Sequence, residues 1–178
     1  SNYTISGDSR FDSVVNTTKN PKSFPVIEQF CKTKTTIICG STWPKDEAIL
    51  IKFIKENLQY NYIIAPHEIH HISQLQKQTG AQLFSTSNTE NINSNNVLII
   101  DSIGILSSVY QYANIAYIGG GFGTGIHNIL EATAFGLPII FGPNYSKFKE
   151  AKELIELEGA KSISNYIELA FAIDLLAD

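Results

Sequence analysis

A glycine-rich stretch carries the strongest chemical signal in the sequence, because five of the seven positions 119–125 are glycine. Glycine lets a backbone turn sharply and approach a ligand closely, and a following helix presents free N–H groups and its positive dipole end to an anion. We therefore predict a phosphate or nucleotide site formed by Gly120, Gly121, Phe122, Gly123, Thr124 and Gly125. A tight turn that only joins a strand to a helix is the alternative.

Polar side chains continue this stretch. Thr124, His127 and Asn128 can donate hydrogen bonds to a phosphate. Glu131 comes one turn after His127, so we expect both on roughly one helix face, where the carboxylate would accept hydrogen bonds from ribose hydroxyls. The pattern differs from the GxGxxG fingerprint of dinucleotide-binding proteins, which makes an NAD-dependent oxidoreductase a weak alternative.

A second polar stretch, GSTWPKDE, begins at Gly40. We predict that Ser41 or Thr42 caps a helix starting near Pro44, with Asp46 and Glu47 placed favourably in its first turn. A further role of the Ser41 hydroxyl as a ligand donor is an even alternative to capping alone.

Two more stretches follow apolar runs. Three histidines fall within five residues in the stretch Pro66-His67-Glu68-Ile69-His70-His71, and we predict no metal site there. We expect His67 to contact a substrate, and His70 and His71 to lie on a solvated helix face. Residues 142–144, Gly-Pro-Asn, mark a turn beside the glycine stretch, and Ser146 is a candidate cap for the next helix.

Composition excludes several classes of protein. The 178 residues suffice for one domain, and a net charge of −4 argues against a nucleic-acid binder. Cys31 and Cys39 form no CxxC pair, which favours two free thiols. No apolar stretch approaches the roughly 20 residues that cross a bilayer. Because methionine is absent, we expect a fragment of a longer protein, in which Ser1-Asn2 is a processing scar.

Short β-branched apolar runs alternate with amphipathic segments along the chain. The runs are residues 36–39, 62–65, 97–100, 115–118 and 138–141, with a weaker one at 160–163. The helix-like segments are residues 45–58, 67–79, 106–113, 128–135, 146–158 and 165–176. Continuous apolar runs indicate strands buried on both faces, so we predict an α/β protein with a Rossmann-like open parallel sheet and helices on both faces. Residues 85–96 are polar and are expected to form a surface loop.

Four motifs together resemble those of a known enzyme family. GDSRFD near the start, GSTWPKDE, IIAPHEIH and the long stretch GGGFGTGIHNILEATAFGLPIIFGPNYSKFKEA closely resemble the 3-deoxy-D-manno-octulosonic acid (Kdo) transferases of lipopolysaccharide synthesis. The resemblance covers essentially the whole chain and corresponds to the C-terminal half of those enzymes. It implies a half of a GT-B glycosyltransferase, in which residues 26–178 bind the nucleotide-sugar donor and residues 1–25 connect to a missing N-terminal domain.

The resemblance also implies a reaction. The enzyme would transfer Kdo from CMP-Kdo to a lipid A precursor, with no further cofactor or metal and with the general base in the missing domain. The implied donor-binding residues are Ser41, Thr42, Pro66, His67, the loop Gly120 to Gly125, Asn128 and Glu131. The parent enzyme would act at the cytoplasmic face of the bacterial inner membrane, and we expect the fragment itself to be soluble, inactive and without nucleic-acid partners.

Two positions depart from the family pattern. Many members carry an arginine–histidine pair after the proline of the third motif, whereas this chain has Pro66-His67-Glu68. A phosphate-binding cation is thus missing, or is supplied by His67 or by a lysine elsewhere. Members often have proline after the motif glutamate, where this chain has Ala132. A related UDP-sugar epimerase or GlcNAc transferase, and a non-catalytic nucleotide-binding module, are the alternatives.

Overall fold

The computed structural model describes residues 9–177 and has a seven-stranded parallel sheet at its centre. The strand order is β3-β4-β2-β1-β5-β6-β7, and every neighbouring pair is parallel. The strands are β1 Thr36–Thr42, β2 Asn61–Pro66, β3 Gln82–Leu83, β4 Val97–Ile99, β5 Ile115–Ile118, β6 Ile139–Phe141 and β7 Ala160–Ser162. The predicted parallel α/β fold is therefore confirmed.

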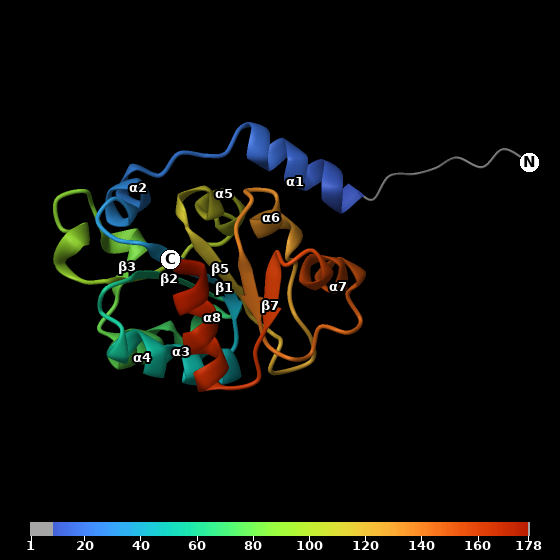
Figure 1. Cartoon of the computed structure of the whole chain (residues 1–178). Helices are drawn as coiled ribbons and strands as arrows, with labels where there is room; N and C mark the ends of the chain where they lie inside the picture. Colours follow the sequence, from blue (N-terminus) through green and yellow to red (C-terminus); the bar gives the residue numbers. More distant parts are fainter. Residues whose placement is uncertain (1–8, 178) are drawn as a thin grey trace, which may run out of the picture.

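Helices cover both faces of the sheet (Figure 1). Helices α1, α2, α5 and α6 lie on one side, and α3, α4 and α8 lie on the other. The α-helices are α1 Ser9–Lys19, α2 Pro25–Cys31, α3 Pro44–Glu56, α4 Ile72–Thr79, α5 Leu106–Val109, α6 Leu130–Thr133, α7 Lys149–Glu156 and α8 Tyr166–Ala177. Short 3₁₀ turns occupy Ile69–His71, Phe84–Thr86, Ile92–Ser94 and Tyr110–Tyr112.

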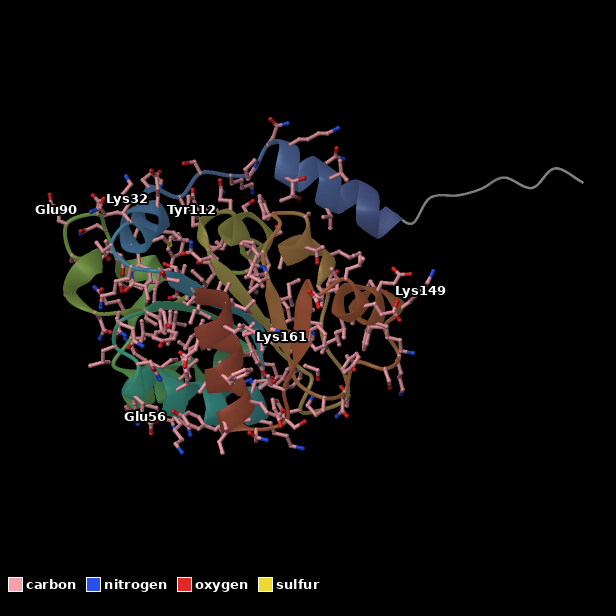
Figure 2. The ribbon with its side chains drawn as sticks, viewed as in Figure 1. Lys32, Glu56, Glu90, Tyr112, Lys149 and Lys161 are labelled. Carbon is pink, nitrogen blue, oxygen red and sulfur yellow. The ribbon has the colours of Figure 1, made fainter. Side chains whose placement is uncertain are left out.

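The central strands bury side chains on both faces of the sheet. In β1, Ile38 packs into the layer that contains α2, α5 and α6, while Ile37 and Cys39 pack into the layer of α3, α4 and α8. All three side chains are at most 1% exposed. This two-sided burial explains why the strands are continuous apolar runs. Charged side chains such as Lys32, Glu90 and Lys149 project outward from the body (Figure 2).

The order of the strands reverses at the centre of the sheet. Strand β1 pairs with β2 on one side and with β5 on the other, so the chain leaves β1 in one direction and returns on its opposite side. In open parallel sheets, the crevice at such a switch point, outside the carboxyl ends of the strands, is where ligands bind. The loops that follow β1 and β5 are therefore the ones that matter for function.

Every predicted strand and helix-like segment has a counterpart, but several boundaries differ. The helix expected from residue 128 begins at Leu130, because the Asn128 side chain accepts the N–H of Leu130 and forms a turn there (3.0 Å). Helix α7 begins at Lys149 with Phe148 as its N-cap, so the expectation that Ser146 caps it was wrong. Strand β3 and helices α1 and α2 carried no recognised pattern.

The expected polar segments also contain regular structure. Residues 9–19 of the expected connecting segment form α1, which packs near α5 and α6, while residues 1–8, with Ser1-Asn2 and the start of GDSRFD, lie outside the described residues. The expected surface loop 85–96 includes a 3₁₀ turn whose Ile92 side chain is fully buried. None of the helices among residues 9–177 is long and apolar enough to cross a membrane.

Candidate functional site

The loops after β1 and β5 meet at the switch point of the sheet. Gly119 donates its N–H to the carbonyl of Gly40 over 2.9 Å, which ties the start of the glycine loop to the end of β1. A Cβ atom at Gly119 would lie 2.2 Å from the Ser41 carbonyl oxygen, so only glycine allows the two backbones to approach this closely. The sheet thus brings two motifs that are far apart in the sequence into one crevice.

Asp46, in the first turn of α3, links the two loops by hydrogen bonds. Its carboxylate accepts the N–H of Trp43 (2.9 Å), the N–H of Gly120 (2.9 Å) and the hydroxyl of Tyr117 (2.8 Å). The Asp46 side chain is only 1% exposed, and a buried carboxylate needs this many donors to offset its lost hydration. Asp46 therefore fixes the end of β5, the glycine loop and the first turn of α3 relative to one another.

The glycine loop has a fixed internal geometry. Gly120 has φ +93° and accepts N–H groups from Gly123 (2.9 Å) and Gly125 (3.2 Å), which closes the loop on itself. Gly121 lies against Gly142, where an added Cβ would come within 2.6 Å of that residue's backbone. The turn after β6 braces the loop further, because Asn144 donates its backbone N–H to Gly121 and its side-chain amide to Gly123.

Three aromatic side chains gather beside this loop. Trp43 donates its indole N–H to Nε2 of His127 over 2.7 Å, and the planes of the two rings are nearly parallel, with 9° between them. The His67 ring stacks against both, with centroids 4.6 Å from Trp43 and 4.4 Å from His127. We call Trp43, His67 and His127 the ring cluster; it joins the ends of β1 and β2 to the glycine loop.

The ring cluster requires a neutral His127. Nε2 accepts the hydrogen bond from Trp43, which a protonated imidazole is unable to do. Burial lowers the pKa of His127 below its ordinary value of 6.5, the neighbouring His67 lowers it further, and Asp46 acts in the opposite direction. With Nε2 occupied, the remaining proton of His127 resides on Nδ1, where it can be donated.

Two cavities open at this end of the sheet, and the ring cluster contributes a side chain to each. The loop cavity, of about 340 Å³, is lined by Trp43, Pro44, Lys45, Gly120, Gly123 and Thr124. The strand-end cavity, of about 470 Å³, is lined by Ser41, Pro66, His67, Glu68, Ser102, Gly104 and other residues that follow β1, β2 and β4. Trp43 lines the first cavity and His67 the second, and these two rings are stacked on each other.

Several donors of the two loops have no partner in the described part of the chain. Among residues 9–177, the backbone N–H groups of Phe122 and Thr124 and the hydroxyls of Ser41 and Thr124 make no hydrogen bond to protein atoms. Ser41 is held in the left-handed region, at φ +53°, which non-glycine residues adopt rarely. Such uncommitted donors, set in a rigid turn, suit an oxygen-rich anion.

The other predicted site residues line neither cavity. Thr42 is buried and donates its hydroxyl to Glu47 over 2.8 Å. Gly121, Phe122 and Gly125 shape the loop, and the Phe122 side chain packs against the core layer of α3, α4 and α8. Asn128 forms the turn before α6. These residues support the crevice through the backbone rather than by a side chain facing the cavities.

Two expectations about the second and third motifs were wrong. Neither Ser41 nor Thr42 caps α3; the N-cap is Trp43, because the Asp46 carboxylate accepts its N–H. His71 does not lie on a solvated face, since its side chain is only 15% exposed and its Nε2 lies 2.9 Å from the buried carboxylate of Glu47. His70, in contrast, is largely exposed, as expected.

Glu131 is not related to His127 as predicted. His127 lies before α6, so the two residues do not share a helix face. Glu131 is half-buried, and this burial raises the pKa of its carboxyl, although a hydrogen bond from the Asn128 side chain acts in the opposite direction. The negative charge of Glu131 contributes to raising the pKa of Tyr110, so the two side chains are neighbours. The Tyr110 hydroxyl also lies against Gly40 near the end of β1.

Three residues of this site were not recognised as site residues from the sequence: Trp43, Lys45 and Asp46. Each lies beside the predicted Ser41-Thr42 pair, in a segment interpreted as a helix start. The available signal was an unusual one, because Trp43 is the only tryptophan in the chain and it directly precedes a proline. Among residues 9–177, no group of three or more His, Cys, Asp or Glu side chains is close enough to hold a metal ion.

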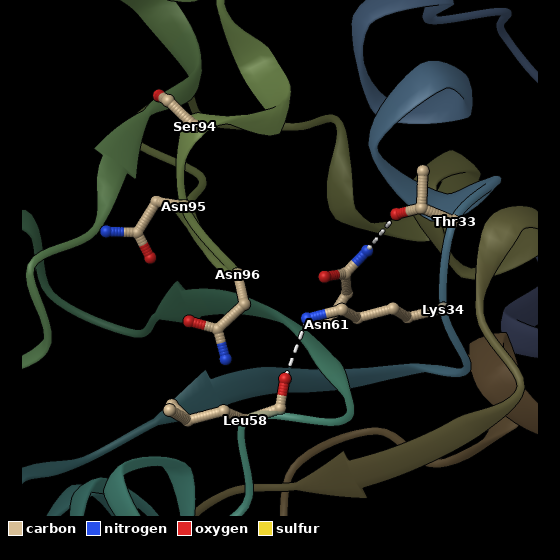
Figure 3. Close-up of a pocket in the computed structure, with 7 residues that line it drawn as sticks. All are labelled: Thr33, Lys34, Leu58, Asn61, Ser94, Asn95 and Asn96. Atoms are coloured by element: carbon tan, nitrogen blue, oxygen red, sulfur yellow. Dashed lines mark hydrogen bonds between the residues drawn. The ribbon is translucent and has the colours of Figure 1, made fainter.

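A third cavity lies at the opposite end of the strands. It measures about 400 Å³ and is lined by Thr33, Lys34, Leu58, Asn61, Ser94, Asn95 and Asn96 (Figure 3). Its polar groups bond mainly to the chain itself: Lys34 donates to the carbonyl of Leu58 (2.7 Å), and Asn61 donates to Phe30 and Thr33. We therefore do not assign a ligand to this cavity.

Comparison with curated proteins gives consistent relatives. The chain is 35% identical over 140 residues to the 3-deoxy-D-manno-octulosonic acid transferase of Aquifex aeolicus, and 32% identical over 169 residues to that of Rickettsia bellii. These matches cover 75% and 89% of this chain, but 39% and 40% of the relatives. The chain thus spans about two fifths of their length. No family model matches it.

A solved structure shares the fold. The chain superposes on the C-terminal CMP-Kdo binding domain of WaaA from Acinetobacter baumannii with a TM-score of 0.72 and 16% sequence identity. The superposition covers 94% of this chain and 89% of that domain. The layered parallel sheet of the two proteins is therefore the same.

Proposed function

We propose that this chain, which is related in sequence to the Kdo transferases, is the domain of such an enzyme that binds the nucleotide-sugar donor, CMP-Kdo. The observation that carries the proposal is the meeting of the GSTWPKDE and glycine loops at the switch point between β1 and β5. Phosphate groups of nucleotides bind at such crevices in other open parallel sheets. The choice of CMP as the nucleotide follows the name of the WaaA domain, which binds CMP-Kdo.

The uncommitted donors fit a phosphate. We assign the free N–H groups of Phe122 and Thr124, together with the Thr124 and Ser41 hydroxyls, to the oxygens of the donor. His67 and His127 would contribute through the ring cluster, and Gly120 to Gly125, Asn128, Thr42 and Pro66 would shape the site. Glu131 would accept hydrogen bonds from the ribose.

During Kdo transfer, negative charge develops on the phosphate oxygen of the departing CMP. An acceptor hydroxyl attacks the anomeric carbon of Kdo, the bond from that carbon to the phosphate oxygen breaks, and CMP leaves with the electron pair. Fixed N–H groups that face the phosphate stabilise this charge without reorganising, which is how preorganised donors lower a barrier. A base removes the proton of the acceptor hydroxyl. The reaction so written requires no metal.

We further propose a division of labour with a second domain. The acceptor, a lipid A precursor, and the base would belong to a part of the enzyme that this chain does not cover, since it spans about two fifths of its relatives. The whole enzyme would then have the two-domain GT-B fold, act at the inner membrane surface, and join residues 26–178 to its other half through residues 1–25.

Calorimetric titration of the chain with CMP, and with UMP as a control, tests the proposal. We expect CMP to bind more tightly than UMP, and Glu131→Ala to weaken CMP binding. Equal binding of both nucleotides would favour a related UDP-sugar enzyme. The absence of binding by either would contradict the donor assignment. Transfer of Kdo by the isolated chain would contradict the division of labour.

A further inference from the structure

We propose that Lys45 is the cation that recognises the negatively charged part of the donor. The inference rests on the proposed function, because it names the group that neutralises the ligand in that same site. Among the residues that line the strand-end cavity, Glu68 is acidic and none is lysine or arginine. Without Lys45, the crevice would offer only neutral donors to a donor substrate that carries two negative charges. A positively charged side chain is therefore needed.

Lys45 lies where such a charge is useful. It is the only charged residue among those that line the loop cavity, which it shares with Gly120, Gly123 and Thr124. The free N–H and hydroxyl of Thr124 belong to this same cavity. An anion held by the glycine loop would therefore lie beside the lysine stem, and an ammonium group on a flexible stem can follow the anion's position.

Lys45 is also uncommitted. Within the described part of the chain it makes no hydrogen bond, ion pair or ring contact. The two acids that follow it in sequence face inward instead: Asp46 bonds to Trp43, Gly120 and Tyr117, and Glu47 bonds to Thr42 and His71. Other lysines are engaged, such as Lys32 with Glu28, Lys149 with Glu153 and Lys52 over the ring of Tyr166.

The position of Lys45 in α3 is unfavourable for the helix itself. It occupies the first turn, directly after Pro44, where the positive end of the helix dipole disfavours a cation. A residue that breaks a local rule without a structural gain is a candidate for a functional role. A bound anion would reverse the sign of this interaction, because it would be attracted by the dipole and by the ammonium together.

Two groups of the donor carry negative charge, the phosphate of the nucleotide and the carboxylate of the sugar. Both present oxygens that an ammonium group recognises in the same way. They are separated by choosing the probe. CMP carries only the phosphate, free Kdo carries only the carboxylate, and cytidine carries neither.

The test is calorimetric titration of wild type, Lys45→Gln and Lys55→Gln with each of the three probes at low salt. Lys55 lies in the last turn of the same helix, is exposed, and makes no hydrogen bond, ion pair or ring contact with described residues, so it is a matched control. We expect Lys45→Gln to weaken CMP binding by about tenfold, the order that loss of one charged hydrogen bond produces. Lys55→Gln should bind CMP as wild type does.

The outcomes separate this inference from the function on which it rests. A loss confined to Kdo, with CMP unaffected, would assign Lys45 to the carboxylate. Wild-type binding of CMP and Kdo that Lys45→Gln fully retains would overturn the inference and leave the proposed function standing. A wild type that binds neither probe would contradict the proposed function, and the inference with it. Thermal unfolding should show Lys45→Gln to be no less stable than wild type, which excludes misfolding as the cause of a loss.

Discussion

The carboxylate of Asp46 accepts the backbone N–H of Gly120 from 74 residues away in the sequence, over 2.9 Å. The same carboxylate fixes the first turn of α3 and the hydroxyl of Tyr117. The loop that we assign to the phosphate is therefore anchored by a residue that does not line either cavity. In this arrangement Asp46 is a positioning residue, and stability and nucleotide binding should respond to it together.

Replacement of Asp46 by alanine should lower the free energy of unfolding by about 3 kcal/mol, because it leaves the buried N–H of Gly120, the buried hydroxyl of Tyr117 and the part-buried N–H of Trp43 without their acceptor. Urea unfolding measures this loss. Glu90→Ala, which removes an exposed carboxylate, should leave the free energy unchanged within about 0.5 kcal/mol. An Asp46→Ala variant as stable as wild type would show that the hydrogen bonds of Asp46 do not stabilise the fold.

Asp46→Asn separates positioning from folding. The amide keeps one acceptor oxygen but presents two donors to groups that themselves donate, so we expect the loop to shift more than the fold weakens. CMP affinity should fall further than thermal stability predicts. Backbone amide spectra should show the largest changes at Gly120 to Gly125. Changes spread evenly over the protein would contradict a local role.

The contact between Gly121 and Gly142 should tolerate no side chain. A Cβ at Gly121 would come within 2.6 Å of the Gly142 backbone, so Gly121→Ala must push the turn after β6 away from the glycine loop. We expect a loss of about 1–3 kcal/mol in thermal or urea unfolding, the usual cost of overpacking. Gly123→Ala is the matched control, since its new Cβ would meet nothing closer than 3.5 Å. Equal stability of the two variants would contradict this account.

The titration of His127 should report the ring cluster. Because its pKa is lowered below 6.5, the unfolded chain takes up this proton before the folded protein does as the pH falls. The stability that His127 contributes is therefore present above pH 6.5 and is lost as the pH falls from 6.5 through the lower pKa of the folded state. Imidazole resonances followed by NMR measure that pKa.

Removing the indole donor should raise the same pKa. The hydrogen bond from Trp43 favours the neutral form of His127, so Trp43→Phe should move the titration of His127 to higher pH. The phenyl ring retains most of the stacking area against His67. A near-UV circular dichroism spectrum establishes whether the variant is folded. An unchanged titration in a folded variant would show that the indole hydrogen bond is absent in solution.

The ionised carboxylate of Glu131 should lower the stability of the fold. Burial raises the pKa of its carboxyl above 4.5, so the ionised form weakens the fold. The contribution of this group to stability is greatest below pH 4.5 and declines as the pH rises through the higher pKa of the folded state. At neutral pH we therefore expect Glu131→Gln to unfold at the same temperature as wild type or higher.

The same variant should bind nucleotide less tightly. If the Glu131 carboxylate accepts ribose hydroxyls, Glu131→Gln should weaken CMP binding by about tenfold, while 2′-deoxy-CMP should lose less. Calorimetry with both nucleotides measures the difference, and Glu90→Gln provides the control at an exposed carboxylate. A variant that loses stability and both affinities alike would indicate a structural role only.

The sequence by itself determined the class of fold and the neighbourhood of the site. Runs such as residues 36–39 and 115–118 are short, β-branched and apolar without alternation, which is typical of strands covered on both faces. The glycine stretch after residue 118 could be recognised because glycine performs a local backbone task, as the positive φ of Gly120 illustrates. Local patterns of this kind are readable because their causes are local.

Only the tertiary structure decided which residues surround the crevice. The pairing of β1 with the distant strand β5, on the side opposite β2, brings Trp43 to His127 and Asp46 to Gly120. The same pairing places Lys45 and Thr124 at one cavity, whereas the packing of α3 near α4 brings Glu47 to His71. Hydrogen bonds and charges act over a few ångströms of space regardless of separation along the chain, so their partners follow from strand order, which no local pattern specifies.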